Sequence, residues 1–183
     1  MKFTPTPLDG AFVVDVEKHA DERGFFARTY CVEEFRARGL IAQVAQCSLS
    51  FNRVTGTLRG MHYQGAPAAE VKLVRCTAGA IYDVIVDVRP GSPTFGQYFG
   101  LELSALNRRA LYVPELFAHG FQTLSDGAEV LYQISELYTP GCARGLRYDD
   151  PALGIRWPLP VSVISEKDAN WPLLGGAVPR AAL

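Results

Sequence analysis

The chain has 183 residues with 18 basic and 19 acidic side chains, so its net charge of −1 does not supply the basic field typical of nucleic-acid-binding proteins. No apolar run approaches the roughly 20 residues of a membrane helix, and the first ten residues lack the apolar stretch of a signal peptide. The hydrophobic fraction of 48% is enough for a substantial core, and no linker divides the sequence, so we expect one domain over residues 1–183. The charge and the lack of long apolar runs predict that neither nucleic acid nor a membrane is a partner.

Short strands are predicted to dominate the chain. In chain order, the pattern predicts a helix over 32–38, ended by Gly39, and strands over 71–76, 80–88, 99–103, 110–113 and 129–137. The proline-rich stretch after Pro151 is expected to be irregular apart from one short helix. Short strands at such close spacing are typical of a β-sandwich or barrel, so we expect an all-β fold with a few short helices.

Strand alternation places carboxylates on an apolar face. In the second predicted strand, Asp83 and Asp87 share a face with Ile81 and Ile85. Two interpretations remain open, because this face either lines the partly polar interior of a barrel or is exposed to solvent. The same alternation predicts an inward-facing Tyr132, whose hydroxyl then needs a polar partner.

The cysteines indicate a reducing compartment. All four are scattered, and no CxxC pair occurs among Cys31, Cys47, Cys76 and Cys142. In a chain that is not a small secreted domain, this usage predicts reduced thiols and a cytoplasmic location.

The segment 56–64, Gly-Thr-Leu-Arg-Gly-Met-His-Tyr-Gln, carries Arg59 and His62 on one predicted strand. Imidazole is suited to moving a proton near neutral pH, and the planar fork of arginine is suited to holding phosphate. The pair suggests proton chemistry on a phosphorylated substrate; the alternative is a surface strand with an inert histidine. A metal site is disfavoured because the histidines, His19, His62 and His119, form no HxH or HExxH pattern. A nucleophilic mechanism is disfavoured by the lack of a GxSxG motif.

Proton transfer needs a base, a group that orients the base and often an acid on the opposite side. His62 is the candidate base and Tyr132 the candidate acid. The other candidates are Asp83, Asp87 and Asp168 as orienting carboxylates, and Lys72 and Arg59 as cations for an enolate or a phosphate.

Most of these candidate residues lie in motifs that are distributed along most of the chain. They are Asp21-Glu22-Arg23-Gly24-Phe25-Phe26, segment 56–64, Lys72-Leu73-Val74-Arg75, Val86-Asp87-Val88-Arg89, Ala118-His119-Gly120-Phe121, Tyr138-Thr139-Pro140 and Ser165-Glu166-Lys167-Asp168. In this joint order the chain resembles the dTDP-4-dehydrorhamnose 3,5-epimerase family of sugar-nucleotide epimerases. The resemblance implies a cupin-type β-barrel or jelly roll and an isomerase of deoxysugar and rhamnose biosynthesis. It implies inversion of C3, C5 or both in a dTDP-4-keto-6-deoxyhexose, with no metal or redox cofactor.

The resemblance also implies the roles of the catalytic residues. His62 would be the base, Asp168 would orient it, Tyr132 would be the acid across the sugar ring, and Lys72 would lie near the developing enolate oxygen.

A further set of residues would bind substrate by the same resemblance. Arg59, His119 and Lys167 would hold the diphosphate or sugar, Gln46 and Ser48 the nucleotide, and Tyr138 would stack on the base. In the family, Arg23 and Phe26 reach the site of a partner subunit, which implies a homodimer.

Two of the positions that depart from the family pattern change the local charge. The family commonly has glutamates where this chain has Arg28 and Ala143, and both glutamates help to hold the nucleotide. Arg28 can contact the nucleotide only as a hydrogen-bond donor, because a guanidinium cannot accept. We therefore expect a weaker preference for thymidine than in typical relatives.

Two other functions fit the same fold. One is a 3,4-ketoisomerase, which moves the carbonyl between C4 and C3, and the other is a non-catalytic barrel that binds sugar nucleotides. Keeping both Tyr132 and His62 favours epimerisation, because inversion needs an acid opposite the base. The complete set of Lys72, Asp168, Tyr132 and His62 disfavours a role in binding alone.

Overall fold

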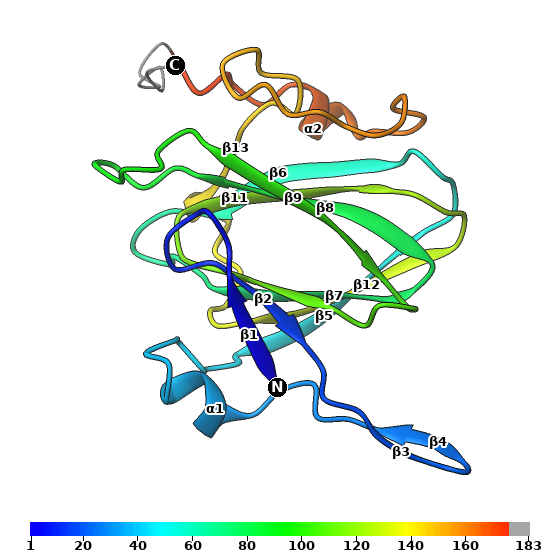
Figure 1. Ribbon diagram of the computed structural model, residues 1–183. Coiled ribbons are helices and arrows are strands. Elements are labelled where there is room, and N and C mark those ends of the chain that lie inside the picture. The colour runs from blue at the N-terminus through cyan, green and yellow to red at the C-terminus, as the bar shows by residue number, and fades with distance from the viewer. Residues whose placement is uncertain (176–183) are drawn as a thin grey trace.

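The computed structural model describes residues 1–175, and this part of the chain forms two large antiparallel sheets that face each other (Figure 1). The six-stranded sheet consists, in spatial order, of β1 (Lys2–Pro5), β2 (Phe12–Asp15), β10 (Ala110–Val113), β7 (Lys72–Ala78), β12 (Ala128–Ile134) and β5 (Gln46–Asn52). The five-stranded sheet consists of β13 (Ala143–Gly145), β6 (Leu58–Gln64), β11 (Phe117–Thr123), β8 (Ala80–Asp87) and β9 (Tyr98–Ser104). The predicted all-β fold is confirmed.

Helices are few and short in the described residues. They are α1 (Val32–Arg36), the 3₁₀ turn η1 (Pro140–Cys142) and α2 (Glu166–Ala169). The helix predicted over 32–38 begins at Val32 as expected but ends at Arg36, two residues early. Gly39 follows with a φ of +70°, which glycine adopts without a Cβ clash. None of these helices is long and apolar enough to cross a membrane.

A hairpin projects from the body of the molecule. Strands β3 (His19–Asp21) and β4 (Gly24–Phe26) pair only with each other, in a separate two-stranded sheet. Figure 1 shows this hairpin at the end of the molecule far from α2.

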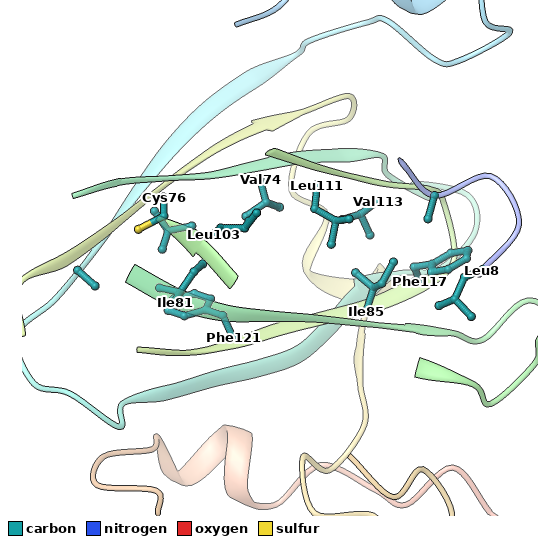
Figure 2. Close-up of a cluster of buried hydrophobic side chains, with 13 residues drawn as sticks. Leu8, Val74, Cys76, Ile81, Ile85, Leu103, Leu111, Val113, Phe117 and Phe121 are labelled. Carbon is teal, nitrogen blue, oxygen red and sulfur yellow. The ribbon is translucent and has the colours of Figure 1, made fainter. Parts of the chain in front are cut away.

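The main core fills the space between the two sheets (Figure 2). Val74 and Leu111 of the six-stranded sheet lie opposite Ile85 and Phe121 of the five-stranded sheet, and all four are at most 1% exposed. Burying each such side chain contributes about 1.5–3 kcal/mol. This core makes the two sheets a rigid frame for the polar residues at its edge.

The face of β8 that carries the two aspartates lies inside the barrel. Asp83 and Asp87 are both fully buried on the same face as Ile81 and Ile85, so of the two interpretations of this face the polar interior is confirmed. The other face of β8 is also buried, because the chain after β13 covers it and forms a second apolar cluster. The chain after β13, residues 146–175, forms an outer layer that carries α2 across the five-stranded sheet (Figure 1).

Asp87 is the centre of a buried polar network. It accepts hydrogen bonds from Arg89 at 2.7 and 3.0 Å, from Ser92 at 2.6 Å and from Thr94 at 2.6 Å. Burial works to raise the pKa of Asp87, but these hydrogen bonds outweigh it and hold the pKa below its ordinary value. The network ties the turn after β8 to the barrel.

We expect Asp87→Asn to lower the free energy of unfolding at pH 7 by about 3–5 kcal/mol, because it leaves the Arg89 guanidinium without its buried counter-ion. The pKa of Asp87 is lower in the folded state than in the unfolded chain. Its stabilisation is therefore complete above the unfolded value of 3.8 and is lost as the pH falls through the folded value. Urea unfolding at pH 7 and pH 3 should show a smaller difference between parent and variant at pH 3.

The matched control is Asp149→Asn. Asp149 pairs with Arg147 at 2.7 Å, but its side chain is 45% exposed, and exposed pairs contribute about 0–1 kcal/mol. Equal losses in the two variants would contradict the role given to Asp87.

Candidate active site

A cleft of about 480 Å³ opens between the two sheets, beneath the outer layer. Ten of the predicted site residues line it: Gln46, Ser48, Arg59, His62, Lys72, His119, Tyr132, Tyr138, Lys167 and Asp168. They come from β5, β6, β7, β11, β12, α2 and the chain before η1. The structure thus brings together in one place residues that lie more than 100 positions apart in sequence.

His62 and Asp168 form a hydrogen-bonded pair in the cleft. His62 Nε2 lies 2.7 Å from Asp168 Oδ1, and Asp168 Oδ2 accepts the backbone N–H of Gly60 at 3.2 Å. Burial works to raise the pKa of Asp168, but the hydrogen bonds from His62, Gly60 and Ser165 outweigh it, so its pKa lies below the ordinary value. An ionised carboxylate only accepts hydrogen bonds, so Nε2 must donate to it. In neutral His62 the acceptor nitrogen is therefore Nδ1, as a general base requires.

Asp168 is placed by the local structure of the outer layer. The Ser165 hydroxyl caps α2 by accepting the backbone N–H of Asp168 at 3.1 Å. The backbone N–H of Leu58 donates to the carbonyl of Val163 at 2.8 Å, which joins this layer to β6. The carboxylate is thereby brought to the histidine from a segment 106 residues later in the chain.

Tyr132 enters the cleft from the other sheet. It lies on β12 of the six-stranded sheet, whereas His62 lies on β6 of the five-stranded sheet. Its ring packs against the core beside Val130, so the predicted inward orientation is confirmed. The pKa of Tyr132 is raised, first by burial and then by the negative charge of Asp83, and Arg59 opposes this only in part. An ordinary phenol, with a pKa of about 10, is already protonated at neutral pH, so Tyr132 carries the proton that an acid must donate, and its raised pKa means that it gives this proton up only to a strong base such as an enolate.

Lys72 is held in the wall of the cleft by an acidic partner. Its ammonium lies 3.0 Å from Glu70 Oε1 and donates to the carbonyl of His62 at 3.2 Å. Glu70 Oε2 in turn accepts from the Gln64 amide at 3.0 Å. Lysine has three N–H donors, so one remains for an oxygen atom in the cleft.

A second histidine–carboxylate pair lies beside the first. His119 is the cross-strand neighbour of His62, and its Nε2 is 2.7 Å from Asp83 Oδ1. Asp83 therefore orients His119, and Asp87 binds Arg89 outside the cleft. Of the three carboxylates considered as partners of His62, only Asp168 contacts it.

The polar residues around these pairs are distributed over both sides of the cleft. Gln46 and Ser48 lie on β5, with Ser48 in register with Tyr132. Arg59 donates to the Asn52 side chain at 2.7 Å, and Tyr138 is 60% exposed.

Three predicted substrate-binding residues lie outside the cleft of their own chain. Arg23 pairs with Asp21 on the hairpin, and Phe26 is 75% exposed there. Arg28 pairs with Glu34 of α1 at 3.2 Å. Within one chain, none of the three reaches the residues that line the cleft.

Among the cleft residues that the sequence analysis missed are Glu70, Arg144 and Trp171. Glu70 stands two positions before Lys72, so strand alternation could have placed the two on one face. Arg144 follows Ala143, and both line the cleft. No sequence pattern indicated Trp171.

Among residues 1–175, no three His, Cys, Asp or Glu side chains are grouped so that they could hold a metal ion. All four cysteines are free.

Comparison with known proteins gives a consistent result. The sequence model of one family, described as dTDP-4-dehydrorhamnose 3,5-epimerase, matches residues 5–175. A protein of that name from Methanothermobacter thermautotrophicus is 44% identical over 173 residues, covering 93% of this chain and 92% of the relative. A dTDP-4-dehydrorhamnose 3-epimerase from Streptomyces niveus is 38% identical over 178 residues, covering 97% and 86%.

A solved structure agrees in fold as well as in sequence. It is the dTDP-6-deoxy-D-glucose-3,5-epimerase of Legionella pneumophila in complex with dTDP-4-keto-L-rhamnose, with a TM-score of 0.89 and 37% identity over 97% of this chain and 94% of that one. The all-β architecture is thus the cupin-like fold of these isomerases. The chain belongs to the dTDP-4-dehydrorhamnose 3,5-epimerase family.

Proposed function

We propose that the protein epimerises a dTDP-4-keto-6-deoxyhexose at C3, C5 or both, in deoxysugar biosynthesis. The observation that carries the proposal is the placement of the His62–Asp168 pair and of Tyr132 on opposite sheets of one cleft. Inversion of a carbon needs a base on one face of the sugar ring and an acid on the other. The names and the bound ligand of the relatives support the same substrate class.

The proposed reaction passes through an enolate. The 4-keto group acidifies the neighbouring C–H bonds, and Nδ1 of His62 removes one of these protons. The electron pair moves to the keto oxygen, where the Lys72 ammonium offsets the negative charge. Tyr132 then donates its proton to the same carbon from the opposite face. Solvent then accepts the extra proton held by His62 and returns a proton to Tyr132.

The proposed binding of the substrate uses the remaining cleft residues. Arg59, His119 and Lys167 hold the diphosphate or sugar, because each can donate hydrogen bonds to oxygen. Tyr138 stacks on the nucleobase, which its exposed ring supports. Gln46 and Ser48 contact the nucleotide from β5.

The deciding experiment is mass spectrometry of a 4-keto-6-deoxy sugar nucleotide incubated with the protein in deuterium oxide. Uptake at C3, at C5 or at both supports epimerisation and identifies the carbon. Both a 3,5-epimerase and a 3-epimerase are among the relatives. No uptake at either carbon, with the substrate still bound and its carbonyl still at C4, would leave only a binding barrel. A product with its carbonyl at C3 would identify a ketoisomerase.

We expect thymidine diphosphate to bind less than tenfold more tightly than uridine or cytidine diphosphate. Ala143 lines the cleft where a glutamate is common in the family, and alanine offers no acceptor to a base or ribose donor. A hydrogen bond to a charged group is worth about 1.5–3 kcal/mol, which is tenfold or more in affinity. Calorimetric titration of the three diphosphates against the parent and Ala143→Glu should show a stronger thymidine preference in the variant. A strong parental preference that Ala143→Glu leaves unchanged would exclude this position.

We also propose that the protein is a homodimer whose hairpin reaches the cleft of the partner. Phe25 and Phe26 on the hairpin are 40% and 75% exposed, and Leu49 and Phe51 on the edge strand β5 are 59% and 57% exposed. Exposed apolar side chains on two such elements are typical of surfaces that another copy covers. The exposed position of Arg23 on the same hairpin supports the proposal.

Phe26→Glu is expected to convert the dimer to a monomer and to weaken binding of thymidine diphosphate about 30-fold or more, the effect of losing an interface hot spot of about 2 kcal/mol. Light scattering coupled to gel filtration measures the first effect and calorimetry the second. Leu173→Glu is the matched control, because Leu173 is 47% exposed on the outer layer, far from the hairpin. A parent protein that is already monomeric and binds nucleotide tightly would contradict the dimer.

Two broader properties belong to the same proposal. The free cysteines support a cytoplasmic location, where thiols stay reduced. The shared core between the two sheets supports a single working domain over residues 1–183.

A further inference from the structure

Trp171 occupies the space beside His62. Gly145 on β13 is the cross-strand neighbour of His62. A Cβ atom at Gly145 would lie 2.4 Å from the indole ring of Trp171, closer than side chains can approach. Because position 145 is a glycine, the Trp171 indole can occupy the space that a side chain at position 145 would otherwise fill.

The indole touches two residues of the proposed site. Its ring centroid lies 6.0 Å from that of His62, with the ring planes at 67°. The Lys167 ammonium lies 5.2 Å from the centroid of the indole, within the range of a cation–π interaction. One side chain thus contacts both the base and a cation proposed to hold the diphosphate.

We infer that Trp171 is a positioning residue that fixes the imidazole plane of His62 and the ammonium of Lys167 relative to each other. This inference rests on the proposed epimerase function. The Asp168 hydrogen bond holds one end of the imidazole, and the ring remains free to rotate about the axis through that bond. The edge contact with Trp171 limits this rotation and keeps Nδ1 directed at the substrate carbon.

Trp171 contacts both His62 and Lys167 through its ring. Nε1 of Trp171 is buried and has no hydrogen-bond partner among the described residues. Trp157, also in the outer layer, does have one, because its Nε1 donates to the Tyr148 carbonyl at 2.9 Å. A phenyl ring at position 171 keeps the kind of ring contact that the indole makes with His62 and Lys167. Phenylalanine, which keeps an aromatic face and lacks the N–H, should therefore preserve much of the function.

The test compares Trp171→Ala, Trp171→Phe and the control Trp157→Phe by steady-state kinetics and by solvent deuterium exchange. We expect Trp171→Ala to lower kcat and exchange together by about 10- to 100-fold, the effect of misplacing a catalytic group by about 1 Å. KM should rise as well, because Lys167 loses its support. On a logarithmic scale, the kcat of Trp171→Phe should lie at least halfway from that of Trp171→Ala back to that of the parent. Trp157→Phe should match the parent.

A second variant keeps the inference testable if Trp171→Ala does not fold. Gly145→Ala retains the indole but forces it to move, so it should reproduce the fall in kcat and exchange. Circular dichroism checks the fold of each variant. Full activity in a folded Trp171→Ala or Gly145→Ala enzyme would overturn the inference. So would a Trp171→Phe enzyme as impaired as Trp171→Ala, because the N–H group would then be the functional part.

These outcomes separate the inference from the function on which it rests. A parent protein that exchanges no deuterium overturns the proposed epimerase, whatever the variants do. An active parent with unaffected Trp171 variants overturns only the role of Trp171. In Trp157→Phe the one remaining tryptophan is Trp171, so its fluorescence should change when thymidine diphosphate is added.

Discussion

His62→Ala is expected to lower turnover by about 100- to 10,000-fold, the usual contribution of a general base. His62 is the histidine bound to the ionised Asp168, and that hydrogen bond leaves Nδ1 as the acceptor. Deuterium exchange should fall by the same factor as epimerisation, because both begin with removal of a proton by His62. Thymidine diphosphate should still bind, since the proposed diphosphate contacts lie elsewhere in the cleft.

Chemical rescue distinguishes a missing base from a damaged fold. The His62 side chain is 42% exposed, so imidazole from solution can enter the space left by the substitution. Added imidazole should restore part of the exchange in His62→Ala and have no effect on the parent. Activity of His62→Ala within a few-fold of the parent would assign the base to another residue, with His119 the first to test.

Local patterns predicted those parts of the site that depend on one strand. Alternation alone put Asp83 on the apolar face of its strand and turned Tyr132 inward, because the period of a strand is fixed by its geometry, but it left open whether the face of Asp83 is interior or exposed. Alternation could not say which histidine Asp83 would meet. That depends on the pairing of β8 with β11, which brings Asp83 to His119 rather than to His62.

The contacts between distant segments required either the family resemblance or the structure. Asp168 lies 106 residues after His62, and nothing in either local sequence indicates that they meet. The resemblance supplied this pair, but it did not supply Trp171. The position of that indole depends on how closely the outer layer approaches β13, and this in turn depends on a glycine at position 145. Such a close approach is a property of packing, which a sequence pattern does not encode.

Tyr132→Phe is expected to lower the rate of net epimerisation by about 100-fold or more, while solvent deuterium exchange continues. Phenylalanine keeps the ring that packs beside Val130 in the core and removes only the acidic proton. His62 still takes the substrate proton and can return deuterium to the same face, so the sugar exchanges without inverting. Mass spectrometry measures the exchange, and proton NMR of the product measures the inversion.

A loss of inversion without a loss of deuterium exchange in Tyr132→Phe would identify Tyr132 as the acid. Tyr132 is protonated at neutral pH, because the ordinary phenol pKa is about 10 and burial and the Asp83 charge raise it further, and its sheet faces the one that carries His62. Both conditions must hold for donation from the opposite face of the ring. Tyr82→Phe, which removes a hydroxyl from the aromatic cluster around Trp157 outside the cleft, should leave both rates unchanged. If exchange and inversion fell equally in Tyr132→Phe, the tyrosine would be a packing residue, and the proton delivered to the opposite face would have to come from another group or from water.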